Sequence, residues 1–139
     1  IGVSNFRKSH LQNLLSKVHI VPSINQIETN PQMVDEETIQ YCKENKIGVE
    51  AWSPLGSGAC LNNPKIQEIA NKYQKSSAQI ILRWLLQKGI VILPKSVHEN
   101  RIKENIDLFN FVLENEDVEL INQLNQHKRT GPDPDNFDF

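Results

Sequence analysis

The chain has 139 residues, a length that suits one domain. It is 38% hydrophobic and 23% charged, as in ordinary globular proteins, and its net charge of −2 gives no reason to expect a nucleic-acid partner. Cys42 and Cys60 lack a His pair at metal-ligand spacing, so no metal site is expected, and Cys42 is interpreted as a small buried side chain. No signal peptide or apolar run of transmembrane length is visible, which predicts a cytoplasmic protein with no membrane partner.

The first half of the sequence predicts strands at residues 1–5, 20–28 and 47–52, separated by two helices. Leu11, Leu14, Leu15 and Val18 recur at the spacing of one helical face. A second helix is expected from about residue 31 to 45.

The second half carries clear helix boundaries. Asn63 followed by Pro64 is typical of a helix start, and Ser76 with Gln79 forms a capping-box pattern. Gly89 is expected to end that helix. A fourth strand is predicted at 90–95, followed by helices around 102–109 and 118–124, the last with Asn115 as its cap.

Four strands that alternate with helices indicate parallel βα units, and both faces of such a sheet need cover. An open doubly wound sheet and a barrel both satisfy this. The strands all end in polar or stacking side chains, which in parallel strands gather on one side. Each strand could simply end where polar residues begin, but the four together favour a shared ligand pocket. In chain order, the two residues at the end of each strand are Ser4-Asn5, Asn25-Gln26, Trp52-Ser53 and Lys95-Ser96.

The fourth tip places Lys95 and Arg101 close to the start of a predicted helix. Cations there oppose the helix dipole, unless an anion is bound by them and by the free N–H groups of the first turn. We therefore expect a phosphate, with Ser96 donating its hydroxyl. The alternative is a solvated basic turn paired with Glu99 or Glu104.

The third tip also suits a nucleotide. Trp52 offers a flat face for stacking, and the small residues of "SPLGSG" would let backbone N–H groups approach a pyrophosphate. No G-x-G-x-x-G fingerprint opens a helix here. Trp52 could equally be a core aromatic.

The stretches "GVSNF", "INQIE", "AWSPLGSG" and "ILPKSVHENRIKEN", in this order, resemble the C-terminal half of an aldo-keto reductase, and the resemblance covers the whole chain. The closing "RTGPDPDNFDF" resembles bacterial members related to 2,5-diketogluconate and glyoxal or methylglyoxal reductases. The resemblance implies an α/β fold in which residues 1–139 are strands 5–8 of a (β/α)8 TIM barrel, with the first half-barrel absent from this sequence.

The family binds NADPH (NADP+) in an extended pose at the carboxyl ends of the strands. By resemblance, Ser4, Asn5 and Gln26 would hold the nicotinamide carboxamide. Trp52 would stack on the nicotinamide ring.

The remaining contacts carried over by resemblance belong to the phosphates and the adenine. Ser53, Leu55 and Ser57 would contact the pyrophosphate, although Ala59 replaces an acidic residue with which some members clasp that group. The other positions would bind the 2′-phosphate and the adenine: Lys95, Ser96 and Arg101 for the phosphate, and Glu104 and Asn105 for the adenine.

The implied activity is NADPH-dependent reduction of aldehydes and ketones to alcohols by a parent enzyme. The family's catalytic Tyr, Lys, Asp and His lie on the first four βα units, so no catalytic residue is assigned here. Tyr41 and Tyr73 fall within predicted helices and are interpreted as packing residues.

Two other functions stay open for the chain itself: a non-catalytic NADP(H)-binding module, and an interaction protein built on a reductase scaffold. The parent is expected to be a monomer that acts on a small carbonyl substrate. The chain alone is expected to be inactive. Its open half-barrel edges could pair with a second copy.

Overall fold

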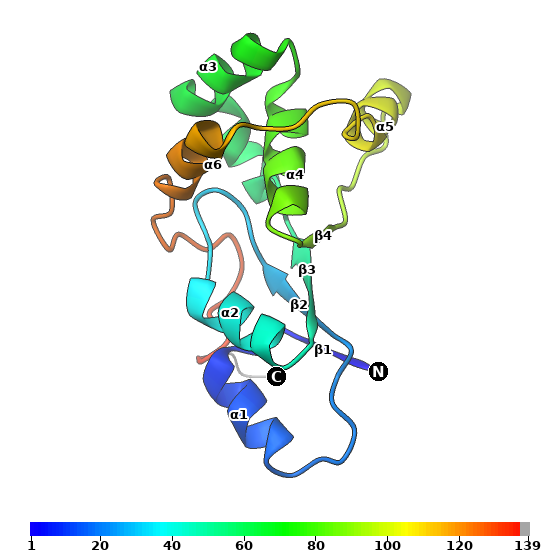
Figure 1. Ribbon diagram of the computed structural model, residues 1–139, viewed down its shortest axis with the longest axis vertical. Helices are drawn as coiled ribbons and strands as arrows, with labels where there is room; N and C mark the ends of the chain where they lie inside the picture. The colour runs from blue at the N-terminus through cyan, green and yellow to red at the C-terminus, as the bar shows by residue number, and fades with distance from the viewer. Residues whose placement is uncertain (137–139) are drawn as a thin grey trace.

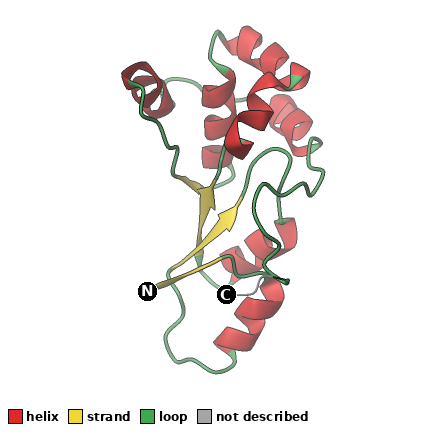
Figure 2. Ribbon diagram, turned by 180° about the vertical axis from the view of Figure 1, so that it is seen from behind, coloured by secondary structure: helices red, strands yellow, loops and turns green. Residues whose placement is uncertain are grey.

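The computed structural model describes residues 1–136 as a four-stranded sheet with helices packed mainly on one side (Figures 1 and 2). The strands run in the order β1-β2-β3-β4, and every neighbouring pair is parallel. The elements in chain order are β1 (Gly2–Ser4), α1 (Lys8–Leu15), β2 (Ile24–Glu28), α2 (Glu36–Glu44), β3 (Gly48–Trp52), the 3-10 segment η1 (Gly56–Asn62), α3 (Pro64–Tyr73), α4 (Ser77–Gln87), β4 (Val91–Ile92), α5 (Glu99–Ile106) and α6 (Asn115–Asn122).

The two faces of the sheet differ in character. Val49 and Ala51 of β3 and Ile27 of β2 point to the helices and are buried. Gln26 and Glu50, which are register partners, alternate with them and are only half-buried. The uncovered face is therefore mostly polar, and the apolar face forms the core.

The core lies between the sheet and helices α1, α2, α3, α4 and α6. Trp84 of α4 is fully buried, and its Nε1 donates to Oδ1 of Asn122 in α6 over 2.9 Å. Cys42 and Cys60 are both free and fully buried, as interpreted for Cys42. Burial raises the pKa of both thiols, although a hydrogen bond from Asn25 opposes the shift at Cys42.

Several predicted helix boundaries are confirmed. Asn63 caps α3 by accepting from the Lys65 N–H over 3.0 Å, and Pro64 is the first helical residue. Ser76 and Gln79 form the reciprocal capping box at the start of α4. Gly89 follows the end of α4 with a φ of 75°.

Other boundaries were wrong. The second strand begins at Ile24 rather than residue 20, because the chain around Pro22 is still a loop. Helix α2 begins at Glu36 rather than near residue 31, since Asp35 caps it by accepting from the Thr38 N–H over 3.0 Å.

The last two helices also differ from expectation. Helix α5 ends at Ile106, so Phe109 lies outside it and is 76% exposed. Asn115 is the first residue of α6 and Glu114 occupies the cap position instead.

The β4 side of the sheet carries most of the exposed large apolar side chains. Strand β4 has only two residues and pairs only with β3. Leu93 is 50% exposed, and Ile102 and Ile106 of α5 are 53% and 73% exposed. Within residues 1–136, no helix is both long and apolar enough to cross a lipid bilayer.

Candidate functional site

The tips of β1 and β3 meet through side chains. Asn5 follows β1 with a φ of 57°, a conformation that Asn tolerates better than most residues. Its Oδ1 accepts from Nε1 of Trp52, the last residue of β3, over 2.8 Å. Its backbone N–H donates to the Gln26 carbonyl over 2.8 Å, and the Ser4 hydroxyl donates to the same carbonyl over 3.3 Å. Four predicted site residues, Ser4, Asn5, Gln26 and Trp52, thus form one connected group, which Gln26 joins through its backbone carbonyl.

A cavity of about 650 Å³ opens beside this group. Its size lies within the range of small-molecule sites. Trp52 and Phe6 supply aromatic surface, and Ser4 and Asn5 supply polar atoms. The other lining residues come from α1, from the turn after it and from the C-terminal tail: His10, Asn13, Leu14, Lys17, Pro132 and Pro134.

Gln26 lies in the middle of the uncovered sheet face. It is the register partner of both Ser4 and Glu50, and its Nε2 donates to a carboxylate oxygen of Glu50. It does not line the cavity beside Trp52. The structure therefore places Gln26 next to the predicted carboxamide contacts, with its amide engaged by Glu50.

The loop after β3 is tightly folded on itself. Ser53, Gly56, Ser57 and Gly58 all have positive φ, and Leu55 packs against the core. The Ser57 N–H donates to Oγ of Ser53 over 3.1 Å, and the Gly56 and Gly58 N–H groups donate to loop carbonyls. We expected backbone N–H groups of this loop to be open to a pyrophosphate. In the structure these three already donate hydrogen bonds within the loop. The hydroxyls of Ser53 and Ser57 lie 3.3 Å apart at the surface of the loop.

The tip of β4 carries the predicted phosphate residues. Lys95 and Arg101 are exposed, and within residues 1–136 neither takes part in an ion pair. Glu99 pairs with Lys103 over 2.7 Å rather than with Lys95 or Arg101. The Ser96 Oγ accepts from the His98 N–H over 3.2 Å just before α5 begins.

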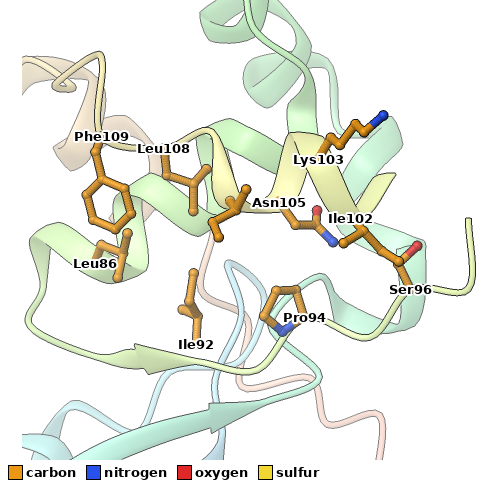
Figure 3. Close-up of a pocket in the computed structure, with 10 residues that line it drawn as sticks. Leu86, Ile92, Pro94, Ser96, Ile102, Lys103, Asn105, Leu108 and Phe109 are labelled. Atoms are coloured by element: carbon orange, nitrogen blue, oxygen red, sulfur yellow. The ribbon is translucent and has the colours of Figure 1, made fainter. Parts of the chain in front are cut away.

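Ser96 and Asn105 line a different space from the Trp52 cavity. It is a groove of about 460 Å³ between β4, α4 and α5 (Figure 3). Figure 3 shows Ser96 and Asn105 toward one end and the apolar Leu86 and Phe109 toward the other. The expected single pocket across all four tips is thus two spaces, with Lys95, Arg101 and Glu104 on exposed surface near the second.

Sequence reasoning did not identify Glu28 as the residue that holds the C-terminal tail at the strand ends. Glu28, the last residue of β2, is only 2% exposed. Its Oε1 accepts from both the N–H and the hydroxyl of Thr130 over 2.6 Å, and its Oε2 accepts from the Gly131 N–H over 3.4 Å. The sequence separation of 102 residues leaves no periodic pattern that could have revealed this contact.

The tail is held a second time at Asp135. Its carboxylate pairs with the guanidinium of Arg7 and lies 3.3 Å from Nε2 of His10. Burial alone would lower the pKa of Arg7, but Asp135 and Asp35 together raise it above its ordinary value. Arg7 is therefore a permanent cation at the start of α1, and it holds the tail close to the tips of β1 and β2.

Within residues 1–136, no cluster of three or more His, Cys, Asp or Glu side chains could hold a metal ion. Tyr41 and Tyr73 lie on α2 and α3 and both pack against the core. Neither lines the cavity beside Trp52. The interpretation of both as packing residues fits these positions.

The fold is built from parallel βα units, and the cavity beside Trp52 lies at the carboxyl ends of the strands, where βα proteins commonly place their sites. The aldo/keto reductase family model matches residues 1–126. The chain belongs to this family.

Curated relatives agree with that assignment. The chain is 52% identical over 139 residues to the uncharacterized oxidoreductase YtbE of Bacillus subtilis and 49% identical to glyoxal reductase of the same organism. It is 43% identical to the methylglyoxal reductase DkgA of Escherichia coli. All of this chain, or 99% of it for DkgA, matches 50% of each relative. The chain thus spans about half the length of the curated relatives it matches.

Solved structures show the same fold. Gox0644, crystallised without ligand, superimposes with a TM-score of 0.96 at 38% identity, covering 100% of this chain and 52% of Gox0644. A mutant of Gox0644 in complex with NADPH gives the same TM-score. The Bombyx mori aldo-keto reductase in complex with NADP gives 0.89 at 41% identity, covering 97% of this chain and 47% of that one.

Proposed function

We propose that this chain is the cofactor-binding half of an NADPH-dependent aldo-keto reductase that reduces small aldehydes and ketones to alcohols. In this proposal residues 1–139 correspond to strands 5–8 of a (β/α)8 barrel. Relatives named as glyoxal and methylglyoxal reductases support the carbonyl substrate class. Family structures solved with NADPH and NADP support the cofactor.

The observation that carries the proposal is the connected group of Ser4, Asn5 and Trp52 beside one cavity. These residues fit a nicotinamide end, because the indole offers a stacking face and the small polar side chains offer amide partners. Gln26 would join them if its amide turned from Glu50 toward the ligand.

The other end of the cofactor would lie at the tip of β4. Lys95 and Arg101 would hold the 2′-phosphate with Ser96, since both cations lack a carboxylate partner within the described residues. Glu104 and Asn105 on α5 would reach the adenine. Between the two ends, the loop of Ser53, Leu55 and Ser57 would contact the pyrophosphate mainly through hydroxyls.

Bound NADPH would supply the hydride that reduces the carbonyl carbon. The residues of this chain would bind and orient the cofactor and exclude water from its ring. We assign no catalytic acid to this chain, so we expect no loss of NADPH absorbance when methylglyoxal is added. Turnover by the isolated chain would contradict that assignment.

The binding test uses quenching of Trp52 fluorescence by NADPH and by NADH. We expect the Lys95→Ala/Arg101→Ala double variant to lose about tenfold or more in NADPH affinity with little change for NADH, because only NADPH carries the 2′-phosphate. Lys65→Ala, which removes an exposed lysine of α3 that pairs with Glu68 over 3.6 Å, is the control. Equal losses for both cofactors would remove the phosphate assignment. An absence of quenching by either cofactor would favour an interaction protein on a reductase scaffold.

A further inference from the structure

We propose that Glu28 is a positioning residue that anchors residues 130–135, here called the strap, and thereby fixes the indole of Trp52 at the strand tips. The importance of this indole for a cofactor rests on the proposed function. The anchoring itself does not, because it follows from contacts within the chain. It can therefore be tested without any ligand.

The first step is the position of the carboxylate. Glu28 and Trp52 are register partners at the ends of neighbouring strands, so both side chains leave the same face of the sheet side by side. The carboxylate is 2% exposed, and within residues 1–136 it joins no ion pair. A buried charge without a counterion needs hydrogen-bond donors.

The strap supplies these donors. Thr130 gives its N–H and its hydroxyl to Oε1, both over 2.6 Å, and Gly131 gives its N–H to Oε2 over 3.4 Å. The 2.6 Å distance from the Thr130 hydroxyl is in the range of charge-assisted O–H···O hydrogen bonds. The strap thus supplies the hydrogen-bond donors that the buried carboxylate of Glu28 needs. In return, Glu28 holds the start of the strap in place.

The second step links the strap to the indole. A Cβ on Gly131 would lie 2.5 Å from Cη2 of Trp52, so the strap backbone runs directly against the ring. Beyond Gly131, Pro132 and Pro134 stiffen the strap and line the same cavity as Trp52. On the opposite edge, Nε1 of Trp52 is held by Asn5. The ring is therefore held between Asn5 and the strap.

The far end of the strap is tied by Asp135 to Arg7 and His10. This contact is exposed, so it should contribute less than the buried contact at Glu28. Removing the hydrogen bonds between Glu28 and Thr130 should free the start of the strap, while Asp135 still holds its end. Trp52 would then lose the contact with the strap at the edge of its ring opposite Asn5.

Two measurements without ligand test the anchoring. The first is the rate at which trypsin cuts after Arg129 and releases the strap, followed by mass spectrometry. The second is acrylamide quenching of tryptophan fluorescence, which reports Trp52 because Trp84 is fully buried. We expect Glu28→Gln and Thr130→Val to raise the cleavage rate by about tenfold, and to raise the quenching constant toward that of the unfolded chain.

The controls separate this effect from general loss of structure. Thr130→Ser keeps the hydroxyl and should behave as the unaltered chain, and so should Glu116→Gln, an exposed carboxylate on α6. If Glu28→Gln fails to fold, Thr130→Val still decides the question, because it alters only the tail. Unchanged cleavage, or faster cleavage with unchanged quenching, would overturn the proposal. Neither result would decide whether the chain binds NADPH, which is tested separately by the comparison of NADPH with NADH.

Discussion

The side chains of Asn5 and Trp52 join the tips of β1 and β3, two strands that are not neighbours in the sheet. The 2.8 Å hydrogen bond from the indole to Oδ1 of Asn5 passes over the end of β2. It fixes the ring at the edge of the cavity that we propose for the nicotinamide. The positive φ of Asn5 lets its side chain reach the ring.

Replacing Asn5 by Gly should remove this hydrogen bond and keep the backbone conformation, which Gly adopts readily. We expect NADPH affinity, measured by quenching of Trp52, to fall about three- to tenfold, because a neutral hydrogen bond contributes roughly 0.5–1.5 kcal/mol. Asn5→Ala should show the same loss of affinity and an additional loss of stability of about 1–2 kcal/mol from backbone strain. Equal stability of the Gly and Ala variants in urea would contradict the role assigned to the backbone.

The two glycines of the loop after β3 form a matched pair. Gly56 and Gly58 have φ of 58° and 92°, so an Ala at either position is strained. At Gly56 the added Cβ would also lie 2.9 Å from Sγ of Cys60, whereas at Gly58 it meets nothing within 4 Å. We expect Gly58→Ala to cost about 1 kcal/mol and Gly56→Ala about 1–3 kcal/mol more, measured by urea unfolding. Similar costs would show that the Cys60 contact relaxes without penalty.

Asp117 joins α6 to α3. Its carboxylate accepts from Nζ of Lys72 over 2.8 Å and from the Tyr73 hydroxyl over 2.6 Å. Burial opposes its ionisation, but these hydrogen bonds outweigh burial and lower the pKa of Asp117 below its ordinary value. We expect Asp117→Asn to lower the free energy of unfolding by about 1–3 kcal/mol at neutral pH.

The sign of the shift sets the pH dependence of this effect. A carboxyl with a lowered folded pKa stabilises fully above its unfolded pKa and loses that stabilisation as the pH falls through the folded value. The stability gap between the unaltered chain and Asp117→Asn should therefore be constant from neutral pH to about pH 5 and close below about pH 4. A gap as large at pH 3 as at pH 7 would mean that packing, not charge, determines the effect. Tyr73→Phe, which removes one donor, should give a smaller gap with the same pH trend.

Both thiols should be unreactive in the folded chain. Cys42 and Cys60 are fully buried, and burial raises the pKa of each. We expect the disulfide reagent DTNB to label neither thiol at pH 8, and to label both as the chain unfolds in urea. Rapid labelling of Cys60 alone would show that the 3-10 segment η1 opens locally.

Helix and strand types were largely predictable because they depend on local patterns. The capping residues Asn63 and Ser76 and the terminal Gly89 act within a few residues of one another, so the structure reproduces them. The second strand was predicted too long, because the apolar pair Ile20 and Val21 looks like strand although Ile20 is 69% exposed in a loop.

The site was only partly predictable. Ser4, Asn5 and Trp52 meet because parallel strands bring their ends to one side, a rule that sequence alone can use. The separation of the β4 tip from the Trp52 cavity depends on where α5 packs, which no local pattern fixes. The role of Glu28 depends on a tail residue 102 positions away, and the motif that contains it looks the same with or without that contact.

The polarity of the uncovered sheet face has a consequence for how the chain behaves in water. Because Gln26 and Glu50 are polar, water can solvate that face at a small cost in free energy. Covering the face with another protein surface would therefore give only a small hydrophobic gain. Most of the exposed large apolar side chains lie instead along one flank, where the two-residue β4 borders Leu93 and Ile106. Any neighbour that binds tightly would gain most of its contact area there.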